Sequence, residues 1–298
     1  MKGVFLTKVE PAYDDLPERR YHFPRTYLRQ AEATIGDWIV YYEPRRVAAS
    51  GSKSGGRQAY FAAAKVVGIR RDPAREDHFY ADVTDYLEFD RAVPFREAGQ
   101  YYETALQRED GGTSKGAFGR AVRTMPNVEF DAILAAGFAP LLGDVRSAEA
   151  LTPHGFEDEP ATFQHPMVER LTVRPFREAA FAVAVKRAYG DTCAFTGLKI
   201  INGGGRAEAQ AAHIRPVAAD GPDSVRNGLA LSGTVHWMFD RGLVSVDDDL
   251  SILVAANRLP DAATRLLLPE RRMLAPSRSE WRPHVQFLRY HRDQVFKG

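Results

Sequence analysis

Hydrophobic positions in the first third of the chain fall into short runs separated by turn signals. The runs are rich in aromatic and β-branched residues, and Gly, Pro and Asp interrupt them, which is typical of β-strands. Strands are predicted over residues 4–6, 38–42, 60–62, 65–69 and 78–83, and a short helix over residues 27–31. Because these strands follow one another at short spacing, residues 1–97 are expected to form a small barrel or curled sheet.

The spacing of apolar residues becomes helical further along the chain. Apolar positions between residues 118 and 139 recur at helical intervals and are interrupted by Pro126, so two short helices are predicted there. Residues 142–164 contain much Gly, Pro and acid and are expected to be a linker. Residues 98–164 as a whole are therefore predicted to be a helical linker region between two domains.

The second half of the chain alternates helix and strand patterns. The predicted elements are a helix over residues 172–189, a strand that leads into a tight turn over 193–197, a glycine hairpin tip at 203–205 and a strand over 207–214. His213 ends this last strand, Asn227 lies in the following loop, and His236 and Asp240 share one side of the next helix. Their separations are 14, 9 and 4 residues, so two strands, a loop and a helix can bring all four side chains around one ion.

Length and composition limit the class of protein. With 298 residues the chain can form two domains, and 44% apolar and 27% charged residues predict a soluble globular protein. No apolar run approaches the ~20 residues of a membrane span. The start MKGVFLTKVEP lacks a secretory pattern, so a cytoplasmic location is expected. The single cysteine, Cys193, excludes internal disulfides and multi-cysteine zinc sites, and a small buried residue is expected there.

The distribution of charge is more informative than the formal net charge of +1. Residues 45–71 contain seven basic residues and no acidic one, and a Gly/Ser-rich loop lies at residues 50–56. Such a loop can clamp the phosphate backbone of DNA, and the alternative is a solvated hairpin tip. The candidates for the clamp are Arg45, Arg46, Lys53 and Arg57.

Aromatic residues are dense in the first third of the chain. Most are expected in the core, because strands of this composition bury one face, but a few can stack on an extruded base. The stretches YHFPRTYL, GDWIVYYEP and AYFAAAKVVGI resemble PUA-like and SRA-like barrels, several of which bind modified bases. This resemblance covers about residues 1–95 and implies a pocket for a flipped, modified cytosine such as 5-methylcytosine. The candidates for the pocket are Tyr21, Phe23, Trp38, Tyr42 and Asp82.

The second half carries a more specific set of motifs: a CxxTG strand, an AAHIxP strand end, an NGL turn and an HxxFDxG helix. Their order and residue types resemble the HNH, or ββα-metal, endonuclease family over about residues 165–298. The resemblance implies an α+β protein, in which a PUA/SRA-like barrel of residues 1–97 is joined by the helical linker to an HNH nuclease domain. It also implies double-stranded DNA as the partner.

The same resemblance implies roles for the four residues of the motif set. His213 is the general base, since a neutral imidazole with an unperturbed pKa of about 6.5 can accept a proton from water near pH 7. Asn227 orients this histidine and fixes its loop. His236, also part of the catalytic set, and Asp240 are the expected ligands of one Mg²⁺ or Mn²⁺ ion, with water and phosphate oxygens in the other positions.

One position departs from the family pattern. Many HNH enzymes place a further metal ligand directly before the base histidine, whereas this chain has Ala212. Gln210 lies close by on the same predicted strand but is a poor ligand. Either the ion keeps more water, or a ligand comes from elsewhere in the chain.

Simpler interpretations exist for single residues. A lone His213 is more often a satisfied structural histidine, although four residues at family spacing argue against that here. Asp240 can end its helix and pair with Arg241. Arg215 can contact a DNA phosphate or pair with Asp220.

Three functions fit these patterns. The first is a modification-dependent DNA endonuclease of the restriction type, which flips out a modified cytosine and hydrolyses phosphodiester bonds with one divalent metal. The second keeps the nuclease but directs it to phosphorothioate or unmodified DNA. The third is a non-catalytic DNA-binding protein with an HNH fold, which His213 argues against, because a degenerate module needs no base. Cutting both strands is most simply done by two active sites, so a homodimer is expected.

Overall fold

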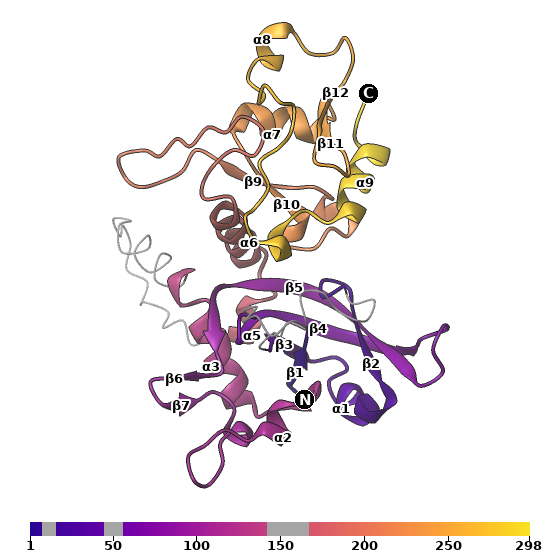
Figure 1. Cartoon of the computed structure of the whole chain (residues 1–298), viewed down its shortest axis with the longest axis vertical. Coiled ribbons are helices and arrows are strands. Elements are labelled where there is room, and N and C mark those ends of the chain that lie inside the picture. Colours follow the sequence, from indigo (N-terminus) through magenta and orange to yellow (C-terminus); the bar gives the residue numbers. More distant parts are fainter. Residues whose placement is uncertain (8–15, 45–55, 142–166) are drawn as a thin grey trace, which may run out of the picture. The chain divides into compact units, whose positions relative to one another are not determined.

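The protein divides into two compact units, Met1–Ala180 and Phe181–Gly298 (Figure 1). Each unit has its own hydrophobic core. The computed structural model describes residues 1–7, 16–44, 56–141 and 167–298. Three clamp candidates, Arg45, Arg46 and Lys53, lie outside the described residues, as does the predicted linker at 142–164. None of the described helices is long and apolar enough to cross a membrane.

A six-stranded sheet with the order β2-β5-β4-β3-β1-β8 forms the first unit. Its strands are β1 (Gly3–Leu6), β2 (Arg20–Pro24), β3 (Trp38–Glu43), β4 (Ala59–Arg71), β5 (His78–Pro94) and β8 (Val122–Thr124). β1 runs parallel to β3, and all other neighbours are antiparallel. Shifts of register interrupt the pairing of β4 with both of its neighbours, and such bulges bend strands. The sheet is therefore curled into an open half-barrel (Figure 1).

The early strand predictions are confirmed in position but not in length. The two strands predicted over residues 60–62 and 65–69 are one strand, β4, because the alanines between them are fully buried in the sheet and do not end it. β5 continues well beyond its predicted end at residue 83. The short helix predicted over residues 27–31 is confirmed as η1 (Arg25–Tyr27) and α1 (Leu28–Glu32).

Residues 98–141 belong to the first unit, although the sequence predicted a separate helical linker there. β8 replaces the first of the two predicted helices, since the residue before Pro126 is restricted to extended backbone and the segment pairs with β1. The second predicted helix is confirmed as α3 (Asn127–Gly137). Gly137 lies directly on the ring of Phe89, where an added Cβ would come within 2.6 Å of the ring. Shorter elements of this region are β6 (Arg96–Glu97), β7 (Gln100–Tyr101), η2 (Thr104–Leu106), α2 (Lys115–Phe118) and α5 (Met167–Arg170).

The second unit surrounds one core with two short antiparallel ladders and several helices. β9 (Gln210–His213) pairs with β10 (Gly228–Leu231), and β11 (Val244–Val246) pairs with β12 (Ile252–Val254). The helix predicted over residues 172–189 is confirmed as α6 (Arg174–Ala188), which runs from the first unit into the second. The other helical elements are η3 (Val217–Ala219), η4 (Val225–Asn227), α7 (Gly233–Asp240), α8 (Asp261–Thr264), η5 (Ser279–Trp281) and α9 (Val285–Gln294).

The tight turn predicted at the end of residues 193–197 is confirmed, but the strand predicted to lead into it is wrong, because residues 194–196 are turn and no part of the segment is strand. Gly197 has φ +73° and donates its N–H to the carbonyl of Cys193. Cys193 and Phe195 are buried in the core, which explains their strand-like composition. The strand that pairs with β9 is β10, which follows Asn227 in the chain.

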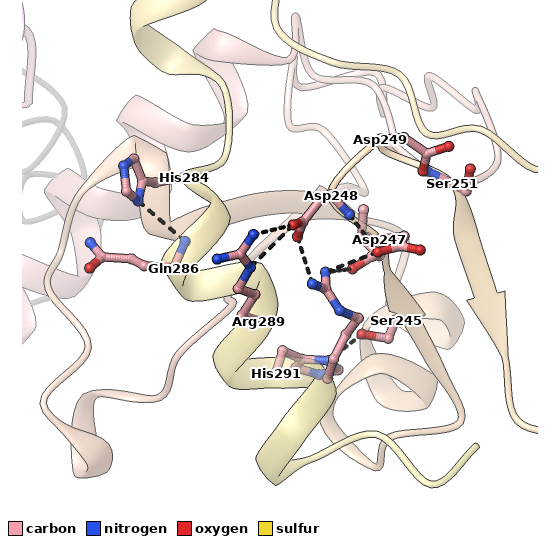
Figure 2. Close-up of polar contacts among 11 residues, drawn as sticks. Ser245, Asp247, Asp248, Asp249, Ser251, His284, Gln286, Arg289 and His291 are labelled. Carbon is pink, nitrogen blue, oxygen red and sulfur yellow. Dashed lines mark hydrogen bonds and ion pairs between the residues drawn. The ribbon is translucent and has the colours of Figure 1, made fainter.

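Helix α9 is tied to the segment after β11 by ion pairs (Figure 2). Arg289 and Arg292, one turn apart on α9, each contact the carboxylate of Asp248, at 2.7 and 2.6 Å. These contacts lower the pKa of Asp248, chiefly through the hydrogen bonds from the two guanidinium groups. The last helix is thereby fixed to the ladder of β11 and β12.

Helix α9 also holds α7 through a buried histidine. The Nε2–H of His291 donates to the carbonyl of Phe239 at 3.1 Å, and its Nδ1 accepts from the hydroxyl of Ser245 at 2.8 Å. Its ring stacks on that of Phe239 with centroids 3.7 Å apart. Burial lowers the pKa of His291 to about 4, so the imidazole is neutral.

Candidate active site

The side chain of His213, at the end of β9, lies between a carboxylate and an aromatic ring. Its Nε2 is 2.9 Å from Oδ1 of Asp223, and its imidazole stacks on Phe181 of α6 with centroids 3.8 Å apart and planes 10° apart. The Asp223 side chain is 7% exposed and that of His213 is 20% exposed. Because an ionised carboxylate only accepts hydrogen bonds, Nε2 carries the proton. In the neutral imidazole, Nδ1 then has the lone pair that can accept a proton from water.

Gly228 permits the contact between Phe181 and His213. It is paired with His213 in the ladder of β9 and β10. A Cβ added to Gly228 would lie 2.4 Å from Cγ2 of Val185 and 3.1 Å from ring atoms of Phe181. A side chain at this position would therefore push α6 away from the strand that carries His213.

Asn227 is fully buried, and its amide binds backbone groups alone among the described residues. Its Oδ1 accepts from the N–H of Arg215 at 2.9 Å, and its Nδ2 donates to the carbonyls of Arg215 at 3.0 Å and Pro222 at 2.9 Å. Pro222 directly precedes Asp223 in the chain. The amide therefore joins the segment after His213 to the segment before its carboxylate partner.

His236 and Asp240 face each other across one turn of α7, as their spacing predicts. Nε2 of His236 is 3.5 Å from Oδ2 of Asp240. The Nδ1–H of His236 donates to the side-chain carbonyl of Gln210 at 2.9 Å, since a carbonyl oxygen can only accept. This hydrogen bond leaves the lone pair of Nε2 on the side of Asp240.

The pair fits a divalent metal ion. One imidazole nitrogen and one carboxylate converge, and the second ring nitrogen is held by an acceptor, as is usual for histidines that bind metals. In the part of the chain that the structure describes, no group of three or more His, Cys, Asp or Glu side chains is arranged to hold a metal ion by itself. Water and phosphate oxygens would therefore complete the coordination of the ion. Ala212, where many HNH enzymes have a ligand, is fully buried in the core.

The predicted residues thus form two pairs on one ββα unit. One pair is His213 with Asp223, which the sequence did not predict, and the other is His236 with Asp240. Within the described residues, no hydrogen bond or ion pair links His213 to His236 or to Asp240. The three residues that sequence reasoning missed are Asp223, Gln210 as a hydrogen-bond partner, and Phe181. The available signal is an acid between the base histidine and Asn227, in the loop that follows the predicted strand.

Two arginines near this site pack on aromatic rings. The guanidinium of Arg215 lies 4.8 Å from the ring centroid of Tyr290 on α9, and its Nε donates to the carbonyl of Ala219. Arg241 lies 4.7 Å from the ring centroid of Trp237. A phosphate contact by Arg215 stays a prediction.

The candidates in the first unit occupy mostly interior positions. Tyr21, Phe23, Trp38 and Tyr42 are at most 4% exposed and belong to the core. The carboxylate of Asp82 is partly exposed and pairs with Arg70 at 3.0 Å. The role of these residues in a base pocket stays a prediction, since a base could reach the four aromatic rings only after a change in packing.

Arg57, the one clamp candidate within the described residues, is paired inside the first unit. Its Nε is 3.0 Å from Oε2 of Glu43, and its guanidinium lies 4.3 Å from the ring centroid of Phe61. With its side chain 11% exposed, little of it is available to a phosphate. The clamp therefore stays a prediction that rests on the other basic residues.

Residues 193–247 match the family model of HNH endonucleases. This chain carries an HNH endonuclease domain. The matched segment contains the His213–Asp223 pair, Asn227 and the His236–Asp240 pair, so the site geometry and the family match concern the same residues. The protein is accordingly a nuclease. Members of the HNH family generally use a divalent metal.

Comparison with solved structures gives weak likenesses. The "Modification dependent TagI restriction endonuclease" is 16% identical with a TM-score of 0.31, over 98% of this chain and 81% of that one. The "Type IV phosphorothioation-dependent restriction endonuclease ScoMcrA" is 13% identical with a TM-score of 0.22, over 97% of this chain and 57% of that one. At these TM-scores neither likeness supports an inference about this chain. No curated protein matches it.

Proposed function

We propose that this protein is a modification-dependent DNA endonuclease of the restriction type. In this proposal, the HNH domain hydrolyses phosphodiester bonds, and the first unit recognises a modified cytosine that is flipped out of the duplex. The observation that carries the nuclease part is the 2.9 Å contact between His213 and Asp223 within the segment that matches the HNH family. An imidazole with one nitrogen held by a carboxylate and the other free to accept a proton is suited to general-base catalysis.

The base works through both ring nitrogens. Nδ1 of His213 takes a proton from a water molecule as the oxygen of that water attacks phosphorus, and the carboxylate of Asp223 stabilises the imidazolium that forms. Stacking on Phe181 fixes the plane of the ring, so that Nδ1 keeps its direction. Asn227 holds the loop that carries the carboxylate.

His236 and Asp240 would hold the metal ion, with Gln210 orienting the imidazole. A bound Mg²⁺ or Mn²⁺ would supply positive charge that stabilises the transition state and the leaving oxygen. Asp240 is about half exposed, which leaves room beside it for water and for a phosphate of the substrate.

Two features of the first unit support recognition of a modified base. Its curled sheet is dense in aromatic residues, which can stack on a base, and the carboxylate of Asp82 is partly exposed. The carboxylate of Asp82 can accept a hydrogen bond from the exocyclic amine of cytosine. Cutting both strands of a duplex with one site per chain further leads us to propose a homodimer on DNA.

The test is cleavage of matched plasmids that are unmodified, cytosine-methylated, hydroxymethylated or phosphorothioated, with Mg²⁺ or Mn²⁺. The proposal predicts selective cutting of the modified-cytosine plasmids. Cutting of the phosphorothioated plasmid alone, or of all plasmids alike, would overturn the specificity and keep the nuclease. No cutting of any plasmid would overturn the nuclease proposal.

Two conservative variants test the pocket without removing a core side chain. Tyr42→Phe removes a buried hydroxyl that has no hydrogen-bond partner among the described residues, so a residue of the core alone should tolerate the change. Asp82→Asn removes the carboxylate, and Arg70→Ala is its control, because it breaks the same ion pair and keeps Asp82. Loss of preference for modified DNA in Asp82→Asn but not in Arg70→Ala would support the pocket. Unchanged preference in both Tyr42→Phe and Asp82→Asn would place recognition elsewhere.

A further inference from the structure

A groove of about 620 Å³ opens beside His236 in the second unit. It is lined by residues of α6, of the segment 200–209 that precedes β9, of β9 itself and of α7. The polar residues of its lining are Lys186, Asn202, Arg206, Glu208, Gln210 and His236. Its volume lies in the range of sites that bind small ligands, and it is large enough for a segment of sugar-phosphate backbone.

The lining carries an excess of positive charge. Lys186 comes from α6 and Arg206 from the segment 200–209, and neither has an ion-pair partner in the described parts of the chain. The acid among the lining residues, Glu208, accepts the N–H of Gly233 at 2.9 Å, at the start of α7. Its charge is therefore partly balanced by the N-terminus of that helix, which leaves two cations available for an anion.

Both cations are presented by ordered backbone. Lys186 lies in the last turn of the regular helix α6. The turn that carries Arg206 is held by Asn202, whose side-chain carbonyl accepts the N–H groups of Gly204 at 3.0 Å and Arg206 at 2.8 Å. Because the backbone of the site is already ordered, binding of an anion between the two cations would cost little conformational entropy.

We propose that this groove binds the phosphate backbone of the DNA strand next to the phosphate that is cut, with Lys186 and Arg206 each contacting a phosphate. His236 and its hydrogen-bond partner Gln210 line the same groove, so a strand lying in it passes directly beside one of the proposed metal ligands. The inference rests on the proposed nuclease function and deepens it, since it assigns the path of the substrate. Clusters of cations without carboxylate partners are the usual contacts of proteins to DNA phosphates.

The experiment measures binding of the full-length protein to duplex DNA in EDTA across a series of salt concentrations. Lys186→Ala/Arg206→Ala should reduce the slope of log affinity against log salt by about 1.8, since each phosphate contact contributes about 0.9. The matched control is Arg258→Ala/Arg265→Ala, which removes two exposed cations of the same unit that do not line the groove. This control should keep the wild-type slope. Lys186→Arg/Arg206→Lys keeps both charges and should keep most of the affinity.

Cleavage by the wild type separates the two proposals. If the wild type cuts DNA while Lys186→Ala/Arg206→Ala keeps the wild-type slope, the groove inference is overturned and the nuclease stands. If the wild type cuts no DNA, the proposed function is overturned, and the slopes still decide whether the groove binds DNA. If Lys186→Ala/Arg206→Ala and the control Arg258→Ala/Arg265→Ala lost the same amount of salt slope, the inference would also be overturned, because the loss would be a general effect of charge. Circular dichroism of each variant identifies any that fails to fold. If Lys186→Ala/Arg206→Ala fails to fold, the DNA affinity of Lys186→Arg/Arg206→Lys is compared with that of the wild type instead.

Discussion

The carboxylate of Asp223 lies 2.9 Å from Nε2 of His213, on a loop that leaves the end of β9 and returns to β10. The contact fixes which ring nitrogen carries the proton and therefore which one can act as a base. Asn227 ties the two ends of this loop together through hydrogen bonds to backbone groups. The base and its carboxylate thus depend on one buried amide for their geometry.

Replacing Asp223 with Asn should slow cleavage by about 10²- to 10⁴-fold, because the amide keeps the shape of the side chain and no longer stabilises an imidazolium. Single-turnover cleavage and DNA binding are the measurements, and binding should stay at the wild-type level. Asp220→Asn is the control in the same loop and should cut close to the wild-type rate. A rate for Asp223→Asn equal to that of the control would show that the carboxylate has no part in catalysis.

Gln210 should affect the metal rather than the chemical step. Gln210→Ala removes the acceptor that holds Nδ1 of His236, so the metal concentration for half-maximal cleavage should rise by about 10- to 100-fold. Saturating metal should restore most of the rate. His236→Ala, which removes a ligand, should not recover in the same titration. An unchanged metal dependence of Gln210→Ala would contradict the orienting role.

Gly228→Ala should destabilise the second unit and slow cleavage together. The new methyl group would overlap Val185 and the ring of Phe181, and overpacking of this kind typically costs about 1–3 kcal/mol. Gly203→Ala is the matched control, because an added Cβ there meets nothing within 4 Å. Urea unfolding and cleavage rates are the measurements. Equal stability of the two variants would show that α6 does not pack closely on β10.

The stability of the second unit should fall in acid because of His291. Its pKa is lowered to about 4 by burial, whereas in the unfolded chain it is near 6.5. Between these values the unfolded state binds more protons, so the free energy of unfolding falls as the pH falls from 6.5 to 4, by up to about 3 kcal/mol. Above about pH 7 this group contributes no pH dependence.

The measurement is urea unfolding at several pH values, followed by the fluorescence of Trp237 and Trp281. These are the tryptophans of the second unit, so a Trp38→Phe background removes the signal of the first. His291→Gln cannot titrate in this range and should show a flatter pH dependence, even though it loses the stack on Phe239. If the free energy of unfolding of His291→Gln depended on pH as steeply as that of the Trp38→Phe parent, other groups would be the cause of the acid sensitivity.

The sequence predicted the local elements of the site better than its contacts. The spacing of His236 and Asp240 on α7 required a shared face, because helix geometry fixes it. The pairing of His213 with Asp223 depends on the path of a loop, which neither spacing nor composition determines. The strand predicted at 193–197 was wrong, since buried Cys193 and Phe195 have the same composition in a turn as in a strand.

In the first unit, the aromatic residues predicted the strands but not which rings a base could reach. Strand composition indicates burial of one face, and here Tyr21, Phe23, Trp38 and Tyr42 are all interior. β8 was missed because a strand of three residues is too short to show a strand period, and its pairing with β1 joins segments far apart in the sequence.

Cleavage by His213→Ala tests the central claim most directly, namely that His213 is the general base of an HNH nuclease site. DNA binding and single-turnover cleavage of a plasmid that the wild type cuts would be measured for both proteins with Mg²⁺ or Mn²⁺. The account predicts that His213→Ala binds the plasmid like the wild type and does not cut it. Cutting by His213→Ala at the wild-type rate would show that the base is another group.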